Sequence, residues 1–445
     1  MKTSFLVVVT AVLGACGGTP PVVDEEGGLP SGPALAVVAG SEVVIVGPDG
    51  VVRGRYGFPP PVSPQLGFVV LSAPRAGRVA AVSYLDGPGE HSSQHQLVLD
   101  RGGRIIWEKR VTGRCGPVRL GDDGDFVSCN PSASSWTYHA VDGGTVEIPG
   151  VNVLADPLSG GLIPASVQRG DATLCGFWNV RTAAFEPWTH ATCGSVFRLG
   201  ASVVHMTVSG DKRAFIEETA SGAHVVESPD FGSRTLILEV NEETHEVLLG
   251  ATHSDTGKLD FDSLVRVDAQ RVAHSVHVRP EVAVRRSPFT AGPAWPHLGP
   301  NGTLLLGQRD AYVGALFQTV NGTEWDRIGQ GLVDIDGITS ASRGGTTVVA
   351  GLRSTPRAMT EPFMFAWEQP LTGDSLQVIT KEDGTVGLTP ARINPFLAIP
   401  LTRDGRRLAY WNDDSLVLFD AREGTLTAVP SLADATGRGA LAWIE

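Results

Sequence analysis

Short apolar runs separated by turn residues recur along almost the whole chain from Ala34 onward. The runs are four to eight residues long and end at Gly, Asp-Gly, Asn-Gly or Pro. Some alternate between apolar and polar positions, as RAFIEE does, whereas VVIV and LVLF are apolar on both sides. Runs of this kind predict β-strands. No stretch keeps i, i+3, i+4 apolar spacing over twelve residues, so the predicted fold class is all-β.

The clearest repeat unit is Leu401–Pro430. It predicts three strands, Arg407–Trp411, Leu416–Phe419 and Thr425–Val429, with a turn at Asp404-Gly405 before the first. Variants of the unit recur unevenly at about 45–50 residues, a period typical of propeller blades. One sheet cannot bury both of its faces alone, and a ring of sheets lets each face pack on a neighbour. The pattern therefore favours a single β-propeller over residues 34–445.

The number of units sets the expected size of the ring. Eight first strands follow Ala73, and a three-stranded fragment lies at Ala34–Gly57. We expect about eight blades, or seven if two weak units merge. Gly439–Glu445 is a candidate strand that can pair with Ala34–Ala39, so the ring would be closed by the N- and C-terminal strands.

Residues 1–15 have the features of an export signal. Lys2 is followed by an apolar run of about eleven residues, too short for a membrane-spanning helix, which needs ~20. The sequence Leu13-Gly14-Ala15-Cys16 resembles the lipobox of bacterial lipoproteins. The resemblance implies cleavage before Cys16 and diacylation of that cysteine. An ordinary secretory signal with a coincidental cysteine is the alternative.

Residues 16–33 predict a flexible tether between the anchor and the propeller. The segment is rich in Gly and Pro, acidic, and without periodicity. Gly17 after the cysteine resembles outer-membrane sorting in Gram-negative lipoproteins. We therefore expect a monomer attached through lipid to the outer membrane, facing the periplasm or the cell surface.

Two repeat motifs resemble known propeller repeats. Thr319, Asn321, Gly322 and Trp325 resemble the Asp-box-like turn of sialidase-type propellers, and Asp100–Trp107 echoes it loosely. The resemblance implies that the Asn side chain holds the turn and that the Trp packs between blades. Asp404-Gly405 ahead of LAYW resembles the repeats of TolB-like periplasmic propellers. We expect blade packing for four tryptophans: Trp295, Trp325, Trp367 and Trp411.

Four cysteines remain after Cys16, an even number that favours disulfides in an exported chain. Three pairings exist. The spacing favours Cys115–Cys129 and Cys175–Cys193, since each pair brackets one turn-rich segment. Zinc is the alternative, but no CxxC or HExxH is present and no His lies at ligand spacing from a Cys. We therefore expect no metal and no cofactor.

Charge excludes one class of partner. The formal net charge is −13, and no cluster of five or more basic residues occurs. Because Lys and Arg contacts to phosphates dominate nucleic-acid affinity, we expect no nucleic-acid partner. An electrostatic binder of anionic membrane surfaces is disfavoured for the same reason.

No residue combination predicts catalysis. GxSxG and P-loop motifs are absent. Four polar groups could bind a metal or act as acid and base, but solvated loops or turns are the preferred interpretation. These groups are His91 and His95 with Glu90; His253, Asp255, Asp260 and Asp262; Asp122, Asp123 and Asp125; and Asp334 with Asp336.

The preferred function is a non-catalytic binding or scaffold module for a protein or glycan. The alternative is a polysaccharide-active enzyme, a sialidase-like hydrolase or a lyase, with its site at the propeller channel. Catalysis needs acid–base groups that converge on one substrate atom, whereas a binder needs only a shaped polar surface. Several carboxylates and arginines converging at the channel would favour the enzyme.

Overall fold

The described part of the chain is all-β. The structure is a computed structural model, and beyond Leu304 the side chains are described only from Thr402 onward. Among the described residues, 3-10 structure occurs at Pro131 and in η3 (Pro430–Leu432). None of the described residues forms a helix with the length and hydropathy needed to cross a membrane. The described ranges are 32–59, 68–84, 93–113, 116–131, 134–189, 194–209, 212–232, 234–252, 260–261, 263–276, 284–285, 296–298, 304–310, 313–319, 326–328, 335–343, 346–354, 360–368, 377–378, 402–404, 406–411, 416–420, 425–432 and 438–445.

The strands form successive antiparallel sheets. The first sheet has the order β3 (Val52–Gly57), β2 (Glu42–Val46), β1 (Ala34–Ala39) and β37 (Arg438–Ile444). The second has β4 (Phe68–Leu71), β5 (Arg78–Tyr84), β6 (Ser93–Asp100) and β7 (Ile105–Thr112). The third has β8 (Arg119–Leu120), β9 (Phe126–Asn130), β10 (Ser135–His139) and β11 (Thr145–Pro149).

The middle of the chain continues this pattern. The fourth sheet has β12 (Val151–Val153), β13 (Leu162–Arg169), β14 (Ala172–Asn179) and β15 (Ala184–Pro187). The fifth has β16 (Val196–Leu199), β17 (Ser202–Ser209), β18 (Lys212–Thr219) and β19 (Gly222–Glu227). The sixth has β20 (Arg234–Asn241), β21 (Glu246–Thr252), β23 (Ser263–Val267) and β24 (Ala273–Val276), beside a two-stranded sheet of β22 (Asp260–Phe261) and β25 (Val284–Arg285).

The last sheets follow the same order. The seventh has β26 (Pro296–Leu298), β27 (Leu304–Asp310), β28 (Val313–Thr319) and β29 (Asp326–Ile328). The eighth has β30 (Ile335–Arg343), β31 (Thr346–Ser354), β32 (Thr360–Glu368) and β33 (Gln377–Val378). The ninth is three-stranded, with β34 (Arg407–Trp411), β35 (Leu416–Asp420) and β36 (Thr425–Val429). These strands confirm the predicted unit at Leu401–Pro430.

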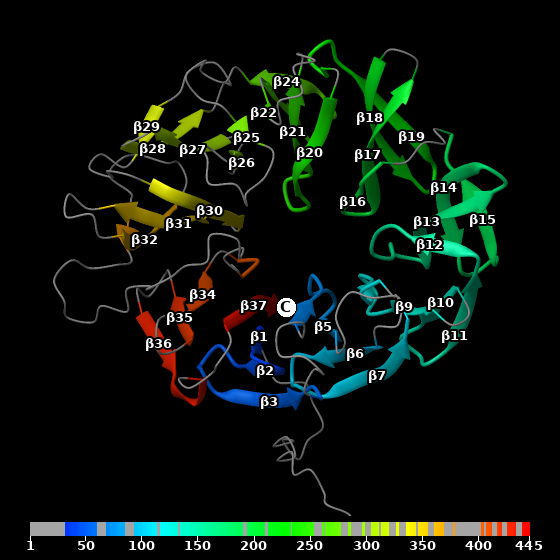
Figure 1. The fold of residues 1–445 in the computed structure, drawn as a ribbon, viewed down its shortest axis with the longest axis horizontal. Helices are drawn as coiled ribbons and strands as arrows, with labels where there is room; N and C mark the ends of the chain where they lie inside the picture. The colour runs from blue at the N-terminus through cyan, green and yellow to red at the C-terminus, as the bar shows by residue number, and fades with distance from the viewer. Residues whose placement is uncertain are drawn as a thin grey trace, which may run out of the picture.

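The sheets follow one another in chain order around a common centre (Figure 1). Neighbouring sheets touch: β37 contacts β4, β5 contacts β8, β10 contacts β12 and β16 contacts β20. This is the propeller architecture that the repeats predict. The terminal strands pair as expected, with Ala34 opposite Ile444 and Val37 opposite Leu441. The predicted blade number of about eight, or seven, is not confirmed.

The first sheet shows why its strands are apolar on both sides. Successive side chains of a strand point to opposite faces. Leu35 and Val37 therefore pack against Trp411 and Leu418 of the ninth sheet. Ala36, on the other face of β1, lies in a second cluster with Val79 and Leu97 of the second sheet. Burial of Trp411 between two sheets confirms the packing role predicted for it, while the side chains of Trp295, Trp325 and Trp367 lie outside the described residues.

In turns between the third and fourth strands, an Asp or Asn side chain accepts hydrogen bonds from the backbone. In the turn after β6, Asp100 Oδ1 accepts hydrogen bonds from the backbone N–H groups of Gly102 and Arg104, both at 2.9 Å. The turn after β23 repeats this with Asp268, and the turn after β14 with Asn179. These side chains replace backbone partners that a tight turn leaves unsatisfied.

The segment Asp100–Trp107 loosely resembles the Asp-box-like turn, and its Trp packs between two sheets as that resemblance implies. Trp107 lies against Phe126 and His139 of the third sheet, with ring centroids 5.4 and 5.2 Å away. Asn321 and Trp325 lie outside the described residues.

The turn before β34 is held by Asp404. The hydroxyl of Thr402 and the backbone N–H of Arg406 donate to its carboxylate, at 2.6 and 3.0 Å, so this aspartate stabilises the turn as expected.

Candidate functional site

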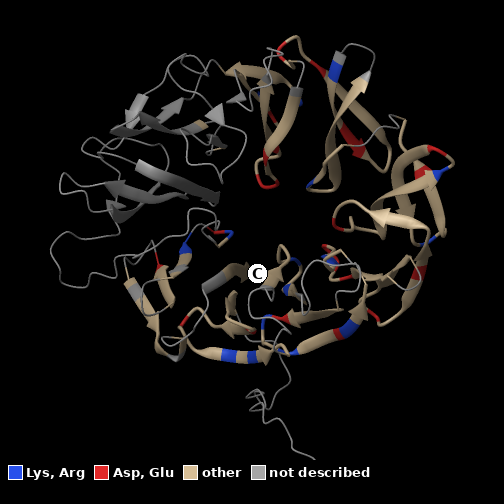
Figure 2. Ribbon diagram, in the orientation of Figure 1, with Lys and Arg blue, Asp and Glu red and all other residues tan. Residues whose placement is uncertain are grey.

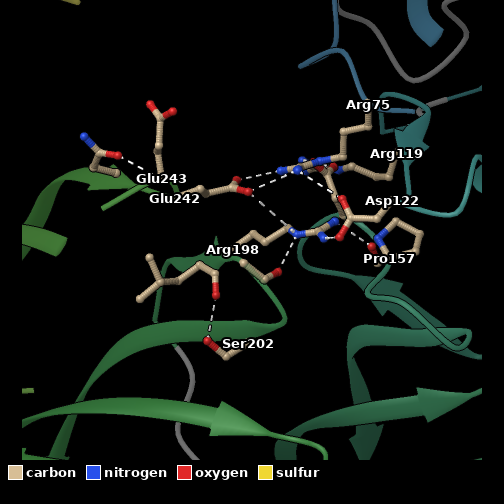
Figure 3. A network of polar contacts seen from close by, with 12 residues as sticks. Arg75, Arg119, Asp122, Pro157, Arg198, Ser202, Glu242 and Glu243 are labelled. Atoms are coloured by element: carbon tan, nitrogen blue, oxygen red, sulfur yellow. Dashed lines mark hydrogen bonds and ion pairs between the residues drawn. The ribbon is translucent and has the colours of Figure 1, made fainter. Parts of the chain in front are cut away.

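Six charged side chains from five consecutive sheets meet at the inner ends of those sheets. Figure 2 shows charged positions along the ribbon at these inner ends, and Figure 3 shows five of the six side chains from close by. Each comes from the hairpin between the first and second strands of its sheet, or from the strand end beside it. The residues are Arg75 of the second sheet, Arg119 and Asp122 of the third, Asp156 of the fourth, Arg198 of the fifth and Glu242 of the sixth. We call this set the inner charge network.

Arg75 is the hub of the inner charge network. Its Nη2 donates to Glu242 Oε1 at 2.6 Å and its Nη1 to Glu242 Oε2 at 3.1 Å, a two-pronged contact. Its Nε donates to Asp156 Oδ2 at 3.1 Å, and Nη1 lies 3.5 Å from Asp122 Oδ1. Burial lowers the pKa of Arg75, but its hydrogen bonds to the carboxylates of Glu242 and Asp156, with their negative charges, outweigh this and raise it above the ordinary value. The guanidinium is therefore permanently charged.

Arg198 is the most buried member, with only 4% of its side chain exposed. Its Nη1 donates to the carbonyl oxygen of Pro157 at 2.7 Å and its Nε to that of Gly200 at 2.9 Å. Its Nη2 pairs with Asp122, and Glu242 Oε2 lies 4.0 Å from its Nε. Burial lowers the pKa of Arg198, and the carboxylates of Asp122 and Glu242 counter that effect.

Arg119 is held less closely than the other two arginines. Its Nη1 lies 3.8 Å from Asp156 Oδ1, a long ion pair, and its buried Nε has no hydrogen-bond partner among the described residues. A guanidinium carries five N–H donors in a fixed fork. Arg119 therefore has one N–H donor, at Nε, that the described part of the fold does not satisfy.

The network is layered. The side chains of Arg75 and Arg198 are 13% and 4% exposed, whereas those of Asp122 and Glu242 are 40% and 39% exposed. The guanidinium groups of Arg75 and Arg198 thus lie below the carboxylates of Asp122 and Glu242, while Arg119 is 33% and Asp156 15% exposed. Three arginines oppose three carboxylates, so formal charge is balanced within the set. The arginines of the network can bind an anionic group, but each of them already pairs with a carboxylate of the network.

The GDDGD segment builds one corner of the site. Gly121 N–H donates to the carbonyl of Asp125 at 2.8 Å, and Gly124 adopts a φ of +81°, which confirms the predicted turn. Asp123 accepts from the N–H of Gly160 at 3.1 Å. Asp125 is buried, and burial raises the pKa of its carboxyl group. Assigning Asp122 to a turn alone was incomplete, because its carboxylate also pairs with Arg198.

His95 corrects the sequence interpretation. It was expected in a solvated loop, but it lies in β6 and is 7% exposed. Its Nε2 is 2.7 Å from Glu108 Oε1 and 3.1 Å from the Tyr56 hydroxyl, which itself donates to Glu108 at 2.7 Å. That hydrogen bond from Tyr56 lowers the pKa of Glu108. The buried faces of two sheets meet here, which is why the strand continues through a polar sequence.

Other predicted site residues are less fully placed. Cys129 and Cys175 are disulfide-bonded, while Cys115 and Cys193 lie outside the described residues, so the pairing stays a prediction. Among the described residues no group of three or more His, Cys, Asp or Glu could hold a metal. The remaining candidates lie wholly or by their side chains outside the described residues: Cys16, Glu90, His91, His253, Asp255, Asp260, Asp262, Asp334 and Asp336.

One sequence signal could have revealed the inner charge network. Its members occupy similar places in successive units, at or after the first strand. A comparison of these hairpins across units would have found a charged residue in each of five neighbours. Reading each acidic cluster alone instead assigned it to a turn.

Comparisons with known proteins assign no family. No family model matches the chain, and no curated protein matches it. Among solved structures, the β-propeller domain of the Trilobed protease from Pyrococcus furiosus is 12% identical, with a TM-score of 0.36 over 71% of this chain and 99% of that one. Pyrococcus horikoshii acylaminoacyl peptidase is 13% identical with a TM-score of 0.38, and the chain spans 57% of its length. The dihydro-heme d1 dehydrogenase NirN is 12% identical, with a TM-score of 0.37 over 93% of this chain and 80% of that one. At this level of similarity none of them carries a function over to this chain.

Proposed function

We propose that this chain is an exported lipoprotein whose β-propeller is a non-catalytic binding or scaffold module for a protein or glycan. Residues 1–15 are the signal, Cys16 carries the lipid, and residues 16–33 tether a monomer to the outer membrane. The propeller ring closes through the pairing of β1 with β37. If each sheet of three or four strands is one blade, the ring has nine blades, one more than the sequence count.

One observation carries the binding role: the carboxylates of the inner charge network are committed to arginines. A general acid or base must be free to exchange a proton with a substrate atom. Guanidinium nitrogens instead lie 2.6–3.8 Å from the carboxylate oxygens of Asp156 and Glu242, and the carboxylate of Asp122 pairs with Arg198. Such a set is strongly polar and its carboxylates are paired, which suits recognition more than proton transfer.

Three measurements test the proposal. Mass spectrometry of the mature protein should find diacylglycerol on Cys16, and Cys16→Ala should release the protein from the membrane fraction. Crosslinking in intact cells should then join a partner to the hairpins that carry Arg75, Asp122 and Glu242. Partners attached only to the outer strands β3, β7 and β11 would contradict the assigned surface, and a retained N-terminal Met would contradict anchoring.

A polysaccharide-active enzyme is the second candidate, because arginines and carboxylates do converge at one end of the propeller. The wild-type protein would then release reducing ends or unsaturated sugars from an acidic polysaccharide. Arg75→Ala and Glu242→Gln should each abolish that release. If product forms at the same rate in both variants, the inner charge network is not the catalytic site.

A further inference from the structure

We propose that Arg75 and Arg198 form a binding site for the carboxylate of an acidic sugar, and that Glu242 occupies this site as a tethered competitor. The inference rests on the proposed binding function and names its ligand class. It follows from how Glu242 is held, from what holds the two arginines, and from the donors that Arg119 offers beside them.

Glu242 is bound in the way that a guanidinium binds a free carboxylate. Both of its oxygens accept hydrogen bonds from Arg75, at 2.6 and 3.1 Å, and one of them lies 4.0 Å from Arg198 Nε. Parallel N–H contacts to both oxygens of one carboxylate are the strongest and most specific geometry for this pair. The side chain therefore marks where an incoming carboxylate would sit (Figure 3).

The two arginines are held by groups other than Glu242. Asp156 accepts from Arg75 Nε at 3.1 Å, and the carbonyls of Pro157 and Gly200 accept from Arg198 at 2.7 and 2.9 Å. Departure of Glu242 would leave these contacts intact. The guanidinium groups would keep their orientation, so a ligand would find a site that is already formed.

Glu242 is placed to exchange with a ligand. It lies on the hairpin between β20 and β21 and reaches Arg75 from the sixth sheet, while 39% of its side chain is exposed. Asn241 holds that turn by accepting from the N–H groups of Glu243 and Thr244 at 3.0 and 3.1 Å. The turn is thus maintained by Asn241, and the Glu242 carboxylate can leave without unfolding it.

The neighbouring groups favour a sugar acid over an acidic peptide. A uronate carries one carboxylate among several hydroxyl donors, and Asp122 and Asp156 are acceptors beside the arginines. The side chain of Arg119 is 33% exposed beside them, so its guanidinium group can donate to a ring or hydroxyl oxygen. An acidic peptide side chain brings the same carboxylate without hydroxyl groups to donate to these acceptors.

The test compares Glu242→Ala with its neighbour Glu243→Ala, an exposed residue of the same turn. Calorimetry with trigalacturonic acid should show binding about tenfold tighter to Glu242→Ala than to the wild type, because the apparent affinity is reduced to the fraction of molecules whose site is free of the internal competitor. Glu243→Ala should bind like the wild type, and neutral maltotriose should bind none of the proteins. Equal affinities for the two variants would overturn the proposal.

A second readout guards against loss of folding. The substitution Glu242→Ala should lower Tm by about 2 °C or more, and trigalacturonic acid should restore the Tm of this variant. Arg198→Lys introduced into Glu242→Ala should remove both the restored Tm and the binding. Recovery by triglutamate or inorganic phosphate but not by the uronate would refute the sugar-acid ligand. These outcomes do not depend on lipidation or on partner capture, so they fail separately from the proposed function.

Discussion

His139 is a residue whose surroundings should make stability depend on pH. Its ring stacks on Phe126, with centroids 4.4 Å apart and planes at 11°, and its Nε2 lies 2.9 Å from Ser128 Oγ. Burial lowers the pKa of His139 from 6.5 to about 4, and Lys109 adds to the effect. Between these two values the unfolded chain binds a proton that the folded chain does not, so stability falls as pH falls through this range.

Replacement by Phe should remove this dependence, because Phe keeps the stacking but cannot be protonated. We expect the wild type to lose about 2 kcal/mol more unfolding free energy than His139→Phe between about pH 7 and pH 4, after allowance for partial exposure. Urea unfolding at several pH values measures the difference, in which the contributions of the other histidines cancel. Parallel curves for the two proteins would mean that His139 is not buried as described.

Residues such as His95 and Arg198 show what the sequence could not reveal at this scale. His95 and Tyr56 are 39 positions apart, and Arg198 and Asp122 are 76 apart. Nothing local in a polar segment distinguishes a solvated loop from a strand whose partners arrive from another sheet. The turn roles of Asp404 and Asp100 were predictable, since their hydrogen bonds close within four residues.

Strands and turns were the predictable elements, while contacts between elements were not. Within β35, the burial of both faces follows from LVLF alone, and β34 and β36 match their predicted bounds. The close approach of β3 to the turn after β6 has no such signature. A Cβ on Gly54 would lie 2.9 Å from the Cα of Gly103, so the two backbones are nearly in contact.

Gly54 therefore predicts a large effect from a small substitution. Gly54→Ala should destabilise the protein by about 1–3 kcal/mol, because the facing atoms are backbone and cannot rotate away. Gly57→Ala, in the same strand, is the matched control, since its nearest neighbour would be a Glu42 oxygen at 4.0 Å. Denaturant midpoints compare the two. A loss of stability as large in Gly57→Ala would assign the effect to the strand backbone and not to the contact.

For the whole molecule, the pairing of β1 with β37 determines how the ends of the chain contribute to stability. Both faces of β1 are buried, and Leu35 and Trp443 belong to one core cluster. Removal of residues 438–445 would expose the inner edge of β1 and leave Trp411 partly uncovered. Because an unpaired edge in a buried sheet leaves its N–H and C=O groups unsatisfied, we expect loss of cooperative unfolding in this truncated protein.

A circular permutant separates the pairing from the chain ends. Joining residue 445 to residue 34 through a short flexible linker, with new ends between Asp142 and Gly143, keeps every strand. The turn at Gly143 is exposed and a Cβ there would meet nothing within 4 Å, so a chain break should be tolerated. The permutant should unfold in one transition near the wild-type Tm, whereas the protein lacking residues 438–445 should not. A permutant that fails to fold, beside a truncated protein that keeps its Tm, would show that the terminal strands do not hold the ring together.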